Sequence, residues 1–139
     1  MRLLDRPREF KKAVGLWGPV VLQMGLIFYF SAQPKGSSVL EEFPLSAPVG
    51  HLGGYFLLGL FLYRAFNGGL QNWGGAAVAF RSMLVGFLYA LSDEFHQLFV
   101  PGRTATLVDL GYDLIGLLLA MAAVRLFIYF KGKADLRLR

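Results

Sequence analysis

Long apolar stretches are the feature of this sequence that most restricts its fold. A helix needs roughly 20 largely apolar residues to cross the hydrocarbon core of a bilayer. Four stretches approach or exceed that length, at residues 16–32, 49–66, 76–100 and 107–130, and short segments rich in Gly, Pro, Ser or Asn separate them. We therefore predict an all-α fold, an integral membrane four-helix bundle. It forms a single membrane domain over residues 1–139, with polar tails at 1–12 and 131–139.

The composition supports a membrane protein. Hydrophobic residues make up 55% of the chain and charged residues 17%, whereas soluble domains carry about 25% charged residues. Such a composition excludes a disordered chain. The sequence has no cysteine, so neither a disulfide framework nor a thiolate metal site can form.

The basic residues predict the orientation of the bundle. If all four stretches span, 12 of the 14 Lys and Arg residues fall on the side of the two termini, and Lys35 and Arg103 fall on the other. Cytoplasmic loops carry the excess of basic residues, so both termini are expected in the cytoplasm. Because the positive charge follows the topology, it does not indicate a nucleic-acid partner.

The first apolar stretch also has features of a secretory signal peptide, since five basic residues precede it. Cleavage requires small residues at the −3 and −1 positions. A cut after Ala32 would place Phe30 at −3. We therefore expect an uncleaved membrane anchor.

With this orientation, most polar residues of the stretches gather near the outer leaflet. A central Asp costs roughly 2.5–3.5 kcal/mol to insert into a membrane, whereas hydrogen bonds between helices average only about 0.6 kcal/mol. A lone His51 or Asp113 could equally serve to hold helices together, but the whole set indicates a functional site. The expected site comprises Ser31, Gln33, His51, Tyr55, Asp93, Glu94, Gln97, Arg103, Asp109 and Asp113.

The residue types suggest chemistry on a lipid headgroup. Asp93 or Glu94 could act as a general base in a partly desolvated site, and His51 as an acid or proton shuttle. The planar guanidinium of Arg103 suits a phosphate or a carboxylate. We expect Asp109 to act in catalysis with His51, Asp93 and Glu94. The remaining polar side chains are expected to bind substrate. The substrate-binding set is Ser31, Gln33, Tyr55, Gln97, Arg103 and Asp113.

A divalent cation is a possible cofactor, because hard cations take oxygen ligands. The candidate ligands are Asp93, Glu94 and Asp109. Adjacent residues on a helix point about 100° apart, so Asp93 and Glu94 cannot easily bind one ion. Neither the ion nor its presence follows from the sequence.

Two contacts follow from the predicted packing. Gly53, Gly54 and Gly59 on the second stretch, with Gly111 and Gly116 on the fourth, would allow the helices to approach closely. His51 should then reach a carboxylate of the third or fourth helix, directly or through one water. Arg103 is expected to pair with Asp109 or Glu94, because an unpaired carboxylate near lipid would lose its charge.

The polar residues also form motifs. These are Gly50-His51 followed by Tyr55 and Leu58-Gly59, then Asp93-Glu94-x-x-Gln97-x-x-x-Pro101-x-Arg103 with Asp109 six residues on, and Gly116. The weaker run from Phe28 to Pro34 precedes them. From about residue 25 to 120, the chain resembles the VanZ-like family of small bacterial membrane proteins.

The resemblance implies a bacterial cytoplasmic membrane protein with a role in the cell envelope. The founding member of the family is associated with low-level resistance to the glycopeptide teicoplanin. Two positions depart from the family pattern: Pro48 stands where a Lys is typical, and Asp113 where an Asn is typical. The resemblance implies no particular reaction.

Three functions remain open. The first is a hydrolase or transferase acting on a lipid or lipid-linked phosphate headgroup at the outer leaflet. The second is a non-catalytic accessory protein that binds a lipid or antibiotic. A transporter or proton relay is less favoured, because the inner halves of the stretches lack a polar path and no inverted repeat is visible. The oligomeric state does not follow from the sequence.

Overall fold

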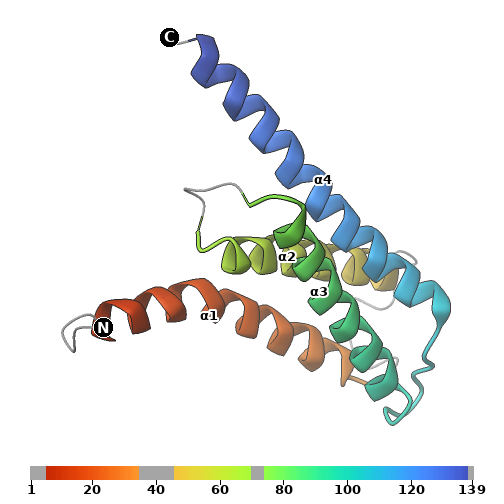
Figure 1. Cartoon of the computed structure of the whole chain (residues 1–139). Helices are drawn as coiled ribbons and strands as arrows, with labels where there is room; N and C mark the ends of the chain where they lie inside the picture. The colour runs from red at the N-terminus through yellow and green to blue at the C-terminus, as the bar shows by residue number, and fades with distance from the viewer. Residues whose placement is uncertain (1–5, 35–45, 70–73, 138–139) are drawn as a thin grey trace.

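The computed structural model describes residues 6–34, 46–69 and 74–137. Within these ranges the chain forms four α-helices and no strand (Figure 1). They are α1 (Arg6–Ser31), α2 (Ser46–Phe66), α3 (Ala76–Gln97) and α4 (Leu107–Arg137). The predicted all-α fold with four helices is confirmed. The side of the membrane on which the termini lie stays a prediction.

Helix α2 lies at the centre of the bundle. It contacts α1, α3 and α4, and its longest interface is with α4. Three helices are long and apolar enough to cross a membrane, over Pro7–Ser31, Ala76–Gln97 and Leu107–Ala134. Helix α2 is not among them, although the sequence predicts four spans. Helix α2 contains His51, Arg64 and four glycines, which lower its mean hydropathy.

Two helices are longer than predicted. Helix α1 starts at Arg6 and α4 continues to Arg137, so parts of both expected polar tails are helical. These segments are rich in Lys, Arg, Glu and Ala, which favour helix. Glu9 also lies in the first turn of α1, where a negative charge stabilises the helix dipole. A polar segment need not be an irregular one.

Helix α3 ends earlier than predicted, at Gln97 rather than at residue 100. The chain then turns through residues 98–102. Gly102 adopts a positive φ of 74° in this turn, a conformation that glycine accepts at little cost. The turn directs the chain back toward the start of α4.

Close packing of α2 against α4 depends on Gly116. A Cβ at this position would lie 2.5 Å from the carbonyl oxygen of Leu52 and 2.9 Å from the amide nitrogen of Phe56. Because both atoms belong to the backbone of α2, they cannot move aside without moving the helix. The predicted close approach is thus present at Gly116.

The other predicted glycines differ, and a Cβ at Gly54 would make only an ordinary contact, 3.5 Å from Ile27 of α1. Gly59 also lies where a Cβ would collide, in its case with Ala120, but Gly53 and Gly111 face open space. The prediction was therefore wrong for Gly53 and Gly111. Gly86 on α3, which the sequence did not single out, lies against Leu117 of α4.

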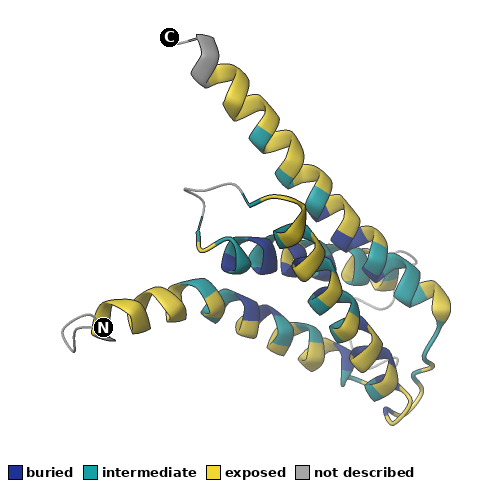
Figure 2. Cartoon of the chain, viewed as in Figure 1, coloured by how far each residue is buried: buried dark blue, intermediate teal, exposed yellow. Residues whose placement is uncertain are grey.

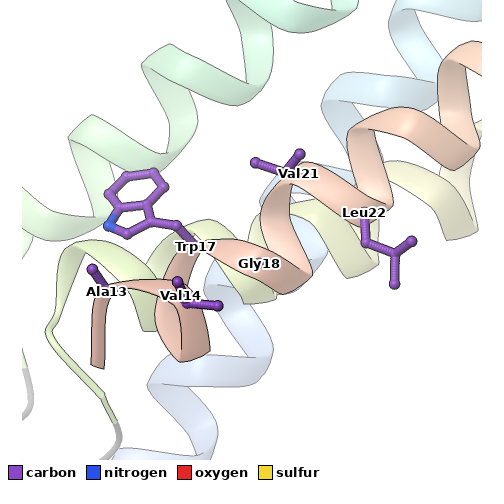
Figure 3. Close-up of a pocket in the computed structure, with 6 residues that line it drawn as sticks. All are labelled: Ala13, Val14, Trp17, Gly18, Val21 and Leu22. Atoms are coloured by element: carbon purple, nitrogen blue, oxygen red, sulfur yellow. The ribbon is translucent and has the colours of Figure 1, made fainter. Parts of the chain in front are cut away.

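Large apolar side chains remain exposed outside the interfaces between the helices. Figure 2 shows exposed positions along the first half of α1 and the second half of α4. One face of α1 bears an open apolar hollow, drawn in Figure 3. It is lined by Ala13, Val14, Trp17, Gly18, Val21 and Leu22. An apolar helix face of this kind is what a span presents to lipid.

Candidate functional site

The polar residues gather at one end of the bundle. The C-terminal ends of α1 and α3 and the N-terminal ends of α2 and α4 all lie at this end (Figure 1, lower right). Contacts between helices confirm the proximity: His51 of α2 reaches Asp113 of α4, and Glu94 of α3 reaches Thr106, just before α4. Residues 62 positions apart in the chain, such as His51 and Asp113, thus meet in one place.

His51 is hydrogen-bonded to Asp113. The distance from His51 Nδ1 to Asp113 Oδ1 is 2.9 Å, and the Asp113 side chain is fully buried. The predicted contact between His51 and a carboxylate of the third or fourth helix is confirmed. Because Nδ1 donates to Asp113, the other ring nitrogen, Nε2, is left for a further partner. Asp113 therefore orients His51 rather than standing beside it as an independent binding group.

Thr106 links Glu94 to the start of α4. The Thr106 amide donates to Glu94 Oε2 at 2.8 Å, and the Thr106 hydroxyl donates to Asp109 Oδ2 at 2.7 Å. In return the Asp109 amide donates to Thr106 Oγ1 at 3.0 Å. This is the geometry of a helix N-cap. Sequence reasoning missed Thr106, although a Thr followed three residues later by an acidic residue is a helix-start signal.

His51, Glu94 and Asp109 form a compact cluster. Each offers one potential ligand atom, and these atoms all lie within 4.8 Å of one another. Two like charges at that distance repel by about 3 to 4 kcal/mol at an effective dielectric constant of about 20. Bringing Glu94 and Asp109 so close is therefore costly unless a positive charge or a proton offsets it.

Asp93 belongs to a different group of side chains. It is buried, and Gln97 Nε2 donates to its Oδ2 at 3.3 Å. The buried Ser31 lies beside it. Tyr55 is buried as well, with its ring centroid 6.3 Å from that of Tyr89. Although Asp93 and Glu94 are adjacent in sequence, they serve different parts of the site.

Several buried polar atoms at this end have no hydrogen-bond partner among the described residues. Folded proteins satisfy the large majority of such atoms, and an exception points to a bound water, ion or ligand. Six are found among the described residues, and four of them belong to the last turns of α1 or α3. They are Ser31 Oγ, Tyr55 OH, Asp93 Oδ1, Glu94 Oε1, His96 Nε2 and Asp113 Oδ2.

Arg103 lies at the C-terminal end of α1. Its guanidinium donates to the carbonyl oxygens of Gln33 at 3.0 Å and Phe30 at 3.2 Å. The last carbonyls of a helix lack partners within it and attract cations. The expected ion pair of Arg103 with Asp109 or Glu94 is not found within the described ranges, so that prediction was wrong.

Gln33 does not join the cluster through its side chain. Its Nε2 donates to the carbonyl oxygen of Tyr29, one turn earlier. Its backbone carbonyl instead holds Arg103. The contribution of Gln33 is thus to fix the connection between α3 and α4 against the end of α1.

Comparison with protein families identifies the family of this chain. The VanZ/LLP1 family model matches residues 16–128, which include every residue of the expected site. The chain belongs to the VanZ/LLP1 family. No curated protein and no solved structure matches it. Together with the three long apolar helices, the family assigns the chain as a membrane protein of the VanZ type.

Proposed function

We propose that this VanZ/LLP1 family protein binds a lipid or lipid-linked phosphate headgroup at the extracytoplasmic face of the bacterial cytoplasmic membrane. The observation that supports this function is the set of six unpartnered polar atoms buried at one end of a mostly apolar bundle. Buried polar atoms without protein partners are suited to a polar ligand. Their position at the helix ends fits a ligand that approaches from the membrane surface.

The surroundings of the site favour a ligand with an apolar tail. Large apolar side chains near the end of α3 and the start of α4 are exposed, with Leu107 86% and Phe99 72% exposed. His51 and Asp109, by contrast, are only partly buried, so the cluster remains accessible. A polar centre beside an exposed apolar surface matches a headgroup joined to acyl or prenyl chains.

The arrangement supports either of two outcomes for the bound lipid. His51 is held in one orientation by Asp113, and the carboxylates of Asp93 and Glu94 could accept a proton. These groups would suit a hydrolase or transferase reaction. The same groups could hold a headgroup without reaction, as in an accessory protein. In either case, we expect a role in the cell envelope that affects resistance to glycopeptides such as teicoplanin.

Binding can be tested with purified protein in nanodiscs. The probes are a polyprenyl phosphate and phosphatidylglycerol, and the measurement is the equilibrium dissociation constant. We expect Asp93→Asn to weaken binding or abolish release of the headgroup. Ser92→Ala is the matched control, because Ser92 is exposed and bonds only its own helix at the Tyr89 carbonyl. Equal affinity in wild type and Asp93→Asn, with no turnover in either, would contradict a role for Asp93.

The side of the membrane can be tested with topology reporters. Fusions after residues 38 and 102 should report the extracytoplasmic side, and fusions after 71 and 139 the cytoplasm. Residues 35–45, which include Lys35, and residues 70–73 lie outside the described residues. A cytoplasmic signal at 102 would invert the bundle and place the site on the inner face.

Transport is the least supported alternative. Among the described residues, the unpartnered polar atoms lie at one end of the helices and do not extend across the bundle. Proton flux into proteoliposomes would establish a relay. Its absence, together with saturable headgroup binding, would leave the binding function.

A further inference from the structure

We infer that His51, Glu94 and Asp109 hold a divalent transition-metal ion, with Asp113 fixing the orientation of His51. The metal site is inferred from the distances and burial of these residues. Its role in attracting the phosphate of a headgroup rests on the function proposed above.

The distances suit three ligands of one ion. The candidate ligand atoms lie within 4.8 Å of one another. In a tetrahedral site with bonds of about 2.1 Å, ligand atoms lie roughly 3.4 Å apart. Side-chain rotations that shift these atoms by about an ångström would therefore complete the coordination. The three ligands come from three different helices: His51 from α2, Glu94 from α3 and Asp109 from α4.

The hydrogen bond between His51 and Asp113 resembles the one that metal-binding histidines usually make through their other ring nitrogen. A histidine that binds a metal through one ring nitrogen usually donates the other N–H to a carboxylate or carbonyl. Here Nδ1 donates to Asp113, which is fully buried. A metal would accordingly bind Nε2, and the pairing with Asp113 selects the tautomer that leaves Nε2 free of a proton.

The burial of Glu94 is an independent indication that a cation binds at this site. Only 7% of this residue is exposed, and its Oε1 has no partner in the described part of the chain. Its other oxygen is held by the Thr106 amide, so the carboxylate cannot turn away easily. A buried carboxylate oxygen without a donor is costly. A cation in contact with Oε1 would remove that cost.

The ligand types indicate which metal fits. An imidazole with two carboxylates suits Zn²⁺ or Mn²⁺ better than Ca²⁺, which takes six to eight oxygens. Three protein ligands leave at least one position open for water or for an oxygen of the ligand. Without a cation the carboxylates of Glu94, Asp109 and Asp113 would repel a phosphate, whereas the open position of a bound dication would accept a phosphate oxygen. Asp93 is not part of this set, which changes the predicted ligands from Asp93, Glu94 and Asp109.

Metal binding can be measured directly on the full chain. The protein is purified in detergent, stripped with EDTA and titrated with Zn²⁺ by calorimetry, and Co²⁺ is added for its absorption spectrum. We expect one equivalent of Zn²⁺ and a Co²⁺ spectrum of low coordination number. His51→Ala should lower the affinity at least 100-fold. Asp113→Asn should lower it about tenfold, within the range for loss of a residue behind a ligand.

Two controls keep the result interpretable. Ser92→Ala changes an exposed side chain that bonds only its own helix, so its affinity for Zn²⁺ should stay within threefold of wild type. Glu94→Gln keeps an oxygen acceptor for the Thr106 amide and should still fold, which thermal unfolding would verify, but should bind Zn²⁺ at least tenfold more weakly. The absence of stoichiometric binding by wild type, or unchanged affinity in folded Glu94→Gln, would overturn the inference.

The lipid assay separates this inference from the proposed function. If wild type binds Zn²⁺ and EDTA lowers headgroup affinity, the metal attracts the phosphate. If EDTA leaves headgroup affinity unchanged, the metal does not attract the phosphate. The metal site itself is then decided by calorimetry alone. Headgroup binding without any Zn²⁺ binding would overturn the metal site and leave the proposed function in place.

Discussion

The two halves of α4 have similar apolar sequences but different surroundings. Residues 107–120 lie along α2 and include four buried positions, whereas no residue of 121–134 is buried. The buried positions are Asp113, Gly116, Leu117 and Ala120. In Figure 1 the second half projects away from the other helices. An apolar run thus predicts a helix and a membrane, but it does not show whether protein or lipid covers that helix.

The difference has a consequence for stability. In the first half, folding of the chain itself fully buries Leu117 and Ala120. In the second half Leu126, Tyr129 and Phe130 stay 57 to 59% exposed. These side chains are covered by lipid or detergent before and after the bundle comes apart, so they contribute little to packing. Substitutions along α4 should reveal this contrast.

The largest expected effect is at Leu117. Its side chain is fully buried against α2 and α3, so Leu117→Ala should lower the free energy of unfolding by roughly 2–5 kcal/mol. Leu126→Ala, the same change in the second half, should cost less than about 0.5 kcal/mol. Denaturation in detergent micelles, followed by circular dichroism, measures both. Equal losses would show that the second half is packed after all.

A smaller effect is expected at Gly116. In Gly116→Ala the new methyl group would meet the α2 backbone at Leu52 and Phe56, and such overpacking costs about 1–3 kcal/mol. Gly132→Ala is the matched change where nothing lies within 4 Å. It should stabilise the helix by up to about 1 kcal/mol, because alanine favours helix over glycine. Opposite signs in the two variants would support the contrast, and a stable Gly116→Ala would contradict the close approach.

The smallest effect is expected at the start of α4. Thr106→Ala removes the N-cap hydroxyl that bonds Asp109, which costs about 1 kcal/mol on average. Thr106→Ser should retain most of the stability. Thr104 is exposed two residues earlier, so Thr104→Ala should leave the melting temperature nearly unchanged. Because Thr106 also positions Asp109 in the cluster, Thr106→Ala should weaken Zn²⁺ binding, whereas Thr104→Ala should not.

The candidate site shows how far sequence reasoning reached. The polar residues were expected at one end because helical rise converts sequence position into depth, and the structure places them at the same end. Their pairing was predicted only in part. The contact of His51 with Asp113 agrees with the prediction. Arg103 donates to the carbonyl oxygens of Phe30 and Gln33, and no ion pair with Asp109 or Glu94 is found among the described residues. Thr106 carried a recognisable helix-start pattern that was not used.

The sequence by itself determined the number of helices, the apolar character of three of them and the position of the polar residues along each helix. These properties are local: they depend on the length of each run and on a rise of about 1.5 Å per residue. Only the tertiary structure decided which side chains meet. Whether His51 faces Asp113, or Glu94 faces Thr106, depends on how each helix is rotated about its own axis. That rotation is set by packing between helices, such as the fit of Gly116 against the backbone of α2, and no single helix carries that information.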